Sequence, residues 1–329
     1  IKIMPKKILI TGISGFIGRH VARQILQSKH ELTAIIRPQT NLKRVEEFQE
    51  KVNFVEIDLT DISSLRNFLD ENSFDTIVHI GALRNGRKFS KNDFFKANVD
   101  ATEQLIINAN RNKSRFIFCS SVGVFGAIPR ELPANNNTPR QNDGFYHYTK
   151  IRAEALIQKY VLYGLQAVIV RPSITYGIGD YGFPFKLTKL TDKNLLFLPN
   201  KKVLIHLTNV ELLAQAFHRL LEFEFTAGAA YIVADKNPVD LKELADFISN
   251  ELKNKPYSNK RIIDEKYFRF AKKIARFFKR ESWITRFELI SESWFYDTED
   301  AYQDLNLKNI STIPAFKIVT DWYKSLRRK

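Results

Sequence analysis

A tyrosine and a lysine stand four residues apart in the segment YHYTK, residues 146–150. On a helix, Tyr146 and Lys150 would share one face. A phenol titrates near pH 10, so it needs a nearby positive charge before it can exchange protons near neutrality. Ser121 could orient a substrate oxygen, and Asn98 could complete a proton relay through water. These residues predict acid–base chemistry at an alcohol or ketone, although a Tyr/Lys pair alone is also typical of an ordinary helix face.

A glycine-rich turn, TGISGFIG, occupies residues 11–18. Gly12 permits a tight turn, Gly15 lets the backbone approach a phosphate, and Gly18 lets a helix pack closely on a strand. The start of the following helix adds unpaired N–H groups and the positive end of the helix dipole. Because the turn follows an apolar strand and opens an amphipathic helix, it predicts a dinucleotide site. Combined with the Tyr/Lys pair, it predicts hydride transfer between a nicotinamide and an alcohol or ketone.

The end of the second predicted strand bears on which dinucleotide binds. Arg37 lies nineteen residues after Gly18, where this architecture meets the adenosine ribose. An acidic residue there would bind a free 2′-hydroxyl, whereas an arginine can hold a 2′-phosphate. We therefore favour NADP over NAD, with a solvated strand-end cation as the alternative. Asp58, after the third strand, is a candidate partner for the adenine amino group or the start of a helix cap.

The elements that must position these residues alternate strictly between strand and helix. Strands apolar on both faces imply a parallel sheet covered on both sides, an α/β doubly wound Rossmann-type fold. After residue 174 the pattern loosens into a smaller, partly helical substrate lobe. We expect a dinucleotide-binding domain over 4–173 and a substrate lobe over 174–329, with segments near 203–223 returning to the first domain. The expected strands are 6–11, 31–37, 52–59, 75–82, 115–122 and 165–173, and the main helices 16–30, 61–72, 93–112 and 146–164.

The composition limits the classes of partner that we expect the protein to bind. The formal charge is +15, and residues 251–290 hold twelve Lys/Arg against five Asp/Glu, so about half the excess lies in one segment. No nucleic-acid-binding motif is interleaved with these charges, so we expect no nucleic-acid partner, and we expect no metal. The single cysteine, Cys119, excludes an intramolecular disulfide and suits a reducing compartment such as the cytoplasm.

Residues 265–281, EKYFRFAKKIARFFKRE, form a late amphipathic segment. Aromatic and aliphatic side chains recur at spacings of three and four, and lysines and arginines fill the opposite arc. Such a helix is typical of peripheral membrane contact, which would put the protein at the inner face of a membrane. We favour instead a substrate-lobe helix that packs its aromatic side chains on the protein and leaves its cations in water, because basic faces are frequent on the helices of globular proteins.

Seven segments in order along the chain resemble the extended short-chain dehydrogenases/reductases. This superfamily includes nucleotide-sugar epimerases and dehydratases, hydroxysteroid dehydrogenases and dihydroflavonol-type reductases. The glycine-rich half is specific, and the C-terminal third resembles the family weakly. The matching segments are TGISGFIG (11–18), IDLTD (57–61), VHIGA (78–82), ANVDAT (97–102), SSVGVFG (120–126), YHYTK (146–150) and RPSITYGIGD (171–180).

The resemblance implies a role for each matching residue. Ser121, Tyr146 and Lys150 become the catalytic trio, with Asn98 as a relay. The residues implied to contact the cofactor are Gly12, Ser14, Gly15, Phe16, Ile17, Gly18, Arg37, Asp58, Leu59, Gly81, Ala82, Tyr146, Lys150, Arg171 and Pro172. It also implies a homodimer through the helices 93–112 and 146–164. No Asp-Glu pair follows Ser121, which disfavours a 4,6-dehydratase.

Three functions remain open at this point. An NAD(P)-dependent reductase or dehydrogenase of the hydroxysteroid or dihydroflavonol type is favoured, acting on a ketone or secondary alcohol. A nucleotide-sugar 4-epimerase is the alternative, but FLPNKKVLIHL (197–207) offers Lys201 and Lys202 and no arginine for a diphosphate. A non-catalytic dinucleotide-binding module comes third, since such proteins typically lose the Tyr or the Lys that this chain keeps.

Overall fold

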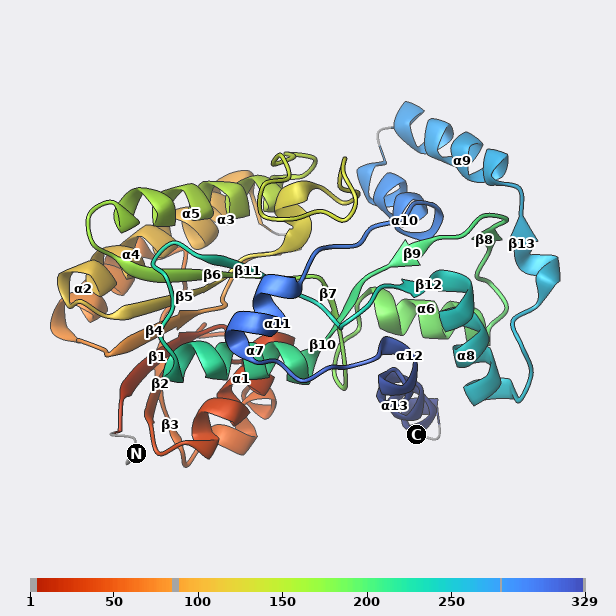
Figure 1. Cartoon of the computed structure of the whole chain (residues 1–329). Helices are drawn as coiled ribbons and strands as arrows, with labels where there is room; N and C mark the ends of the chain where they lie inside the picture. The colour runs from red at the N-terminus through yellow and green to blue at the C-terminus, as the bar shows by residue number, and fades with distance from the viewer. Residues whose placement is uncertain (1–4, 85–88, 279, 328–329) are drawn as a thin grey trace.

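The computed structural model describes residues 5–84, 89–278 and 280–327, without the side chains of residues 281 and 282. A seven-stranded sheet forms the larger lobe, and its adjacent strands all run parallel (Figure 1). The predicted doubly wound α/β fold is thereby confirmed. In spatial order the strands are β11 (Ala230–Val233), β6 (Gln166–Pro172), β5 (Arg115–Cys119), β4 (Thr76–His79), β1 (Lys7–Thr11), β2 (Glu31–Ile36) and β3 (Val52–Glu56).

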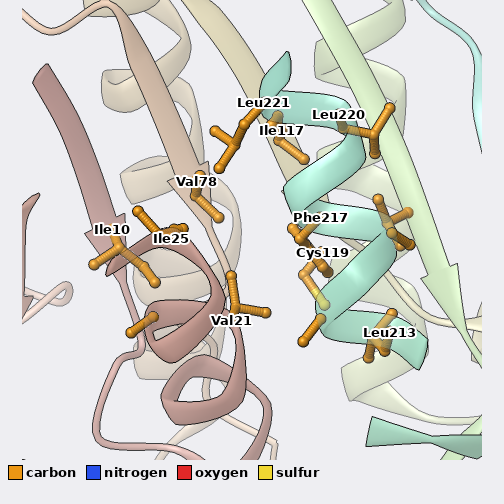
Figure 2. Packing of buried hydrophobic residues seen from close by; sticks show 14 of the residues in the cluster. Ile10, Val21, Ile25, Val78, Ile117, Cys119, Leu213, Phe217, Leu220 and Leu221 are labelled. Carbon is orange, nitrogen blue, oxygen red and sulfur yellow. The ribbon is translucent and has the colours of Figure 1, made fainter. Parts of the chain in front are cut away.

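Helices cover both faces of this sheet, as continuous apolar strands require. One layer contains α2, α4 and α5, and the other α1, α7 and α11 (Figure 1). In the second layer, Val21 and Ile25 of α1 and Phe217 of α7 pack towards the strands, beside Cys119 of β5 (Figure 2). The bounds are α1 (Phe16–Gln27), α2 (Ile62–Glu71), α4 (Ala101–Arg111), α5 (Phe145–Val161), α7 (Val210–Glu222) and α11 (Glu299–Leu305).

The helix expected over 93–112 contains an irregular turn. It begins as α3 (Lys91–Phe95), passes through a π-helical segment (Lys96–Asp100) and continues as α4. Asn98 lies within the π-helical segment and is buried. Two strands also end earlier than expected, so that Arg37 and Asp58 lie in the loops after β2 and β3.

The smaller lobe adjoins the carboxyl-terminal end of β6 and has its own apolar core (Figure 1). Trp294, Tyr176 and Phe316 are among its fully buried side chains. Its elements are β7 (Ile174–Tyr176), α6 (Phe183–Asp192), β8 (Leu198–Pro199), β9 (Leu204–Ile205), β10 (Leu207–Asn209), β12 (Val239–Asp240), α8 (Leu241–Lys253), β13 (Ile262–Ile263), α9 (Glu265–Phe277), α10 (Glu281–Ser291), α12 (Thr312–Ala315) and α13 (Lys317–Arg327).

Helix α9 is oriented differently from the packing expected of a substrate-lobe helix at residues 265–281. It buries Phe268, Ala275 and the aliphatic part of Lys272. The aromatic side chains on its other side, including Phe270 and Phe277, face solvent. The expectation that this helix packs its aromatic face on the protein is therefore wrong, because the buried contact is made by the neighbouring arc.

Candidate active site

The glycine turn and the loop after β4 lie against each other. Gly12 has a φ of +82°, and a Cβ on it would approach the Gly81 nitrogen to 2.6 Å. A Cβ on Gly18 would overlap the Gly12 carbonyl oxygen. Only glycine fits at positions 12 and 18, as the sequence predicted, because turn, strand and helix approach within backbone contact.

Helix α1 begins with free donors. Its N-cap is Gly15, which provides no side-chain cap, and the first turn has no acidic residue. No described residue accepts a hydrogen bond from the N–H groups of Ser14, Phe16 and Ile17, so these groups are available for an anion. This glycine-lined, uncapped helix start fits the pyrophosphate of a dinucleotide.

The loops after β3 and β4 form the adjoining side of this cradle. The Gly81 N–H donates to the Thr11 Oγ1 at 2.9 Å. A Cβ on Gly81 would contact Leu59 Cδ1 at 3.0 Å, and Leu59, Gly81 and Ala82 all remain partly exposed. These three predicted cofactor residues thus lie in loops at the carboxyl-terminal edge of the sheet, where dinucleotides bind in such folds.

Tyr146 and Lys150 lie in the first two turns of α5. Lys150 is 2% exposed, and its Nζ donates to the Cys119 carbonyl at 2.7 Å. The same Nζ lies 4.5 Å from the Phe118 ring centroid and 6.0 Å from that of Tyr146. Among the described residues, none hydrogen-bonds the Tyr146 hydroxyl. The ammonium is thus fixed at the end of β5 beside the Tyr146 ring.

Burial acts on both groups of this pair. It raises the pKa of Tyr146 to about 12, and the positive charge of Arg84 opposes that rise. Burial also lowers the pKa of Lys150 to about 8. Lys150 still carries its proton at neutral pH. Tyr146 needs further positive charge before its phenolate forms at that pH, and an oxidised nicotinamide bound beside it would supply such a charge.

Two consecutive serines follow β5, and their hydroxyls point to different partners. Ser121 Oγ accepts from the Gly123 N–H at 3.0 Å, so its own proton remains free to donate. Ser120 is buried, and its Oγ donates to Glu154 Oε1 at 2.6 Å. The Ser120 hydroxyl proton is thus taken by Glu154, whereas the Ser121 hydroxyl acts in its described hydrogen bond only as an acceptor.

The relay role predicted for the Asn98 side chain does not fit the structure. Its Oδ1 accepts from the Leu83 N–H at 2.7 Å. Its Nδ2 donates to the Leu83 carbonyl at 2.8 Å and to Thr149 Oγ1 at 3.0 Å. With its amide satisfied, Asn98 holds the loop after β4 to α5, and it carries no proton through that side chain.

The Arg171 side chain is likewise unavailable to a cofactor. It is 3% exposed and donates to both Glu154 carboxylate oxygens, at 2.9 and 2.7 Å. A further hydrogen bond of 2.7 Å joins it to Asn136 Oδ1. The predicted side-chain contact at Arg171 is corrected to a buried ion pair. Pro172 continues β6 as a buried residue paired with β11.

Arg37 and Asp58, the two residues proposed to contact the adenosine half of the dinucleotide, differ in whether their side chains already have hydrogen-bond partners. Arg37 is exposed directly after β2. Asp58 Oδ1 accepts from the N–H and the hydroxyl of Thr60, at 2.9 and 2.8 Å. The cap of α2 is Asp61, so Asp58 starts a turn and not a helix. Its second oxygen has no described partner.

One polar pair beside the site was not predicted. His147 Nδ1 lies 2.5 Å from Asp143 Oδ1, and its other ring nitrogen lies against Gly123. The i, i+4 spacing of Asp143 and His147 was the available signal, but only the fold brings the pair to the loop of Ser121. No group of three or more potential metal ligands occurs within the described ranges.

A family model links this geometry to known proteins. The model of the NAD dependent epimerase/dehydratase family matches residues 8–234, which include the glycine turn, Ser121, Tyr146 and Lys150. The chain belongs to this family.

Curated relatives share moderate identity with the chain. A trifunctional UDP-glucose 4,6-dehydratase/UDP-4-keto-6-deoxy-D-glucose 3,5-epimerase/UDP-4-keto-L-rhamnose-reductase of Arabidopsis thaliana is 28% identical over 289 residues, 80% of this chain and 42% of that protein. A UDP-glucose 4-epimerase of Drosophila melanogaster is 27% identical over 169 residues, 47% of this chain and 48% of that protein. The alignments therefore span less than half the length of either relative.

Solved structures agree in fold. The Bordetella bronchiseptica enzyme WbmH in complex with NAD+ has a TM-score of 0.75 at 19% identity, covering 98% of both chains. UDP-glucuronic acid 4-epimerase from Bacillus cereus in complex with NAD has a TM-score of 0.75 at 18% identity, covering 97% of this chain and 99% of that one. At these identities the likeness establishes the shared architecture of both lobes.

Proposed function

We propose that this protein transfers hydride between a nicotinamide dinucleotide and a secondary alcohol or ketone carbon. The observation that supports this proposal is that the uncapped glycine cradle follows β1 and the Tyr146/Lys150 pair lies at the end of β5, on the same carboxyl-terminal edge of one sheet, with β4 between the two strands. A nicotinamide bound there would donate or accept the hydride.

The residues of the chain would handle the proton. In the direction of reduction, Tyr146 donates its phenolic proton to the carbonyl oxygen while Ser121 hydrogen-bonds that oxygen. In the direction of oxidation, the Tyr146 phenolate takes the alcohol proton. Lys150 stabilises the phenolate electrostatically in both directions.

Nucleotide sugars are the substrate class that we favour for this site. The named relatives support it, because their names place their chemistry on UDP-sugars. Neither is named as a hydroxysteroid dehydrogenase or a dihydroflavonol reductase, so the expectation of a reductase of that type lacks comparable support.

Of the two lysines that the sequence offered for the diphosphate of such a substrate, Lys201 is poorly placed. Its ammonium is already paired with Glu292 and Glu265, at 3.0 and 3.1 Å.

The test is to incubate the protein with UDP-sugars and with their 4-keto forms, in each case with NAD or NADP in the oxidised or the reduced form. Consumption of the dinucleotide indicates a net reductase or dehydrogenase. Inversion at C4 without net consumption indicates the second candidate, a 4-epimerase, which the named epimerase relative favours.

The matched variant for this test is Tyr146→Phe, which removes one oxygen. We expect turnover to fall about 10²–10⁴-fold with dinucleotide binding retained. Wild-type turnover in this variant, or dinucleotide binding without turnover of any such substrate by the wild type, would refute the proposal.

A further inference from the structure

An exposed apolar surface lies on α9 and the start of α10, remote from the glycine cradle. Its members, here called the aromatic face, are between 44% and 81% exposed. They fall within seventeen consecutive residues of the chain. They are Tyr267, Phe270, Ile274, Phe277, Phe278 and Trp283.

Helix α9 differs from an ordinary surface helix in which of its side chains are exposed to solvent. The helix buries Lys272, whose Nζ donates to Glu292 Oε1 at 2.6 Å, and turns its large aromatic side chains outwards. Large exposed apolar side chains gathered on one face of a helix mark an interaction site. A rotation of α9 that buried the aromatic face would break the ion pair between Lys272 and Glu292.

Positive charge borders the aromatic face along one side. At about 100° per residue, Lys266 and Lys273 lie next to it on the helix, and Arg269 and Arg276 follow. Lys273 forms no ion pair with any residue that the structure describes. Arg269 and Arg276 pair with Glu265 and Glu288 at 3.0 and 3.5 Å while about two-thirds exposed, so these pairs are weak and exchangeable.

We propose that the aromatic face of α9 and α10 docks on the surface of a membrane rich in anionic lipid. Aromatic side chains next to lysine and arginine complement the boundary between acyl chains and phosphate headgroups. A second copy of this chain is a poorer occupant, because residues 265–280 hold seven Lys/Arg against one acidic residue and self-pairing would bring like charges together.

The fold leaves this surface accessible. Helix α9 lies at the outer edge of the smaller lobe, with α10 between it and the rest of the molecule (Figure 1). No described helix is both long enough and apolar enough to span a bilayer.

The test is sedimentation of the full chain with vesicles of phosphatidylcholine alone or mixed with phosphatidylglycerol. We expect at least about tenfold stronger binding to the anionic vesicles at low salt, weakened by added salt. The emission of Trp283 should shift to the blue on binding, and Trp283→Phe should remove that shift. No binding to anionic vesicles at low salt would overturn the proposal.

Two double variants separate the parts of the surface. F270S/F277S and K266E/K273E should each reduce binding about tenfold or more, with unchanged thermal unfolding. The control is L162S/Y163S, which alters two exposed apolar residues at the end of α5. Loss of binding in the lysine variant alone would indicate non-specific charge attraction and overturn the proposal. So would wild-type dimers, seen by light scattering, that the serine substitutions of the aromatic face disperse.

Discussion

At the scale of single residues, the proposed proton transfer depends on Tyr146 and Lys150, and the contacts of Lys150 are the most informative about its role. Its ammonium is buried between a carbonyl, a phenyl ring and the Tyr146 phenol. Sequence spacing predicted the pair, since four residues on a helix fix a shared face. The pKa values near 12 and 8 arise from burial by the surrounding fold and could not be predicted from spacing.

Replacing Lys150 should move the pH dependence of the reaction. Oxidation needs the Tyr146 phenolate, so its rate rises with pH through the pKa of Tyr146. Lys150→Met removes one positive charge near the phenol, so it should raise the pKa of Tyr146 and move the rising limb to higher pH. The rate at neutral pH should fall about tenfold for each pH unit by which the midpoint rises. The measurement is kcat against pH in both proteins, and a lower rate with an unmoved midpoint would contradict it.

The choice of dinucleotide can be tested at Arg37. If its exposed guanidinium holds a 2′-phosphate, Arg37→Ala should raise the Kd for NADPH about tenfold, or about 1.4 kcal/mol, and leave that for NADH unchanged. Titration of both cofactors by fluorescence measures this, with Lys51→Ala as a matched exposed cation. Equal effects on both cofactors would show that Arg37 does not discriminate between them.

At the scale of elements, sequence periodicity located most strands and helices of the sheet lobe. It could not predict the π-helical segment that contains Asn98, nor the bond from Asn98 to the Leu83 backbone, because both depend on distant packing. It identified the apolar arc of α9 but not which arc contacts the protein. That choice depends on Phe268 and on the pairing of Lys272 with Glu292, twenty residues away.

Two glycines of the turn should respond differently to the same substitution. Gly18→Ala places a methyl group against the Gly12 backbone, where nothing can yield, and should destabilise the fold by several kcal/mol. At Gly15 the nearest atom, Gly12 O, is 3.1 Å away, so Gly15→Ala should fold and mainly weaken dinucleotide binding. Thermal unfolding and cofactor titration of both variants test this. Equal loss of stability in the two would contradict it.

For the whole molecule, the buried side chain of His79 makes the free energy of unfolding depend on pH. His79 is 1% exposed between Thr11 and Thr102, and burial, with a smaller effect of Lys150, lowers its pKa to about 3. The unfolded chain protonates this ring near pH 6.5. Between these values the unfolded state binds the extra proton, so the free energy of unfolding falls as pH falls from 6.5 towards 3.

The variant His79→Gln should lack this contribution. Its deficit in stability relative to the wild type should shrink by about 2 kcal/mol between pH 7 and pH 5. Urea unfolding at both pH values measures the difference. A deficit that stays constant with pH would show that His79 is not the titrating group.

The path of the backbone between the two lobes has a consequence for how they can move apart. After β6 the chain enters the smaller lobe, returns for α7 and β11, leaves again, and comes back once more for α11 before ending in α13. Several connecting segments of the chain thus cross from one lobe to the other. A motion that moves the two lobes apart must bend all of these segments together. A protease nick in the connection between α6 and β8 should leave two fragments that co-elute under native conditions and separate only in denaturant.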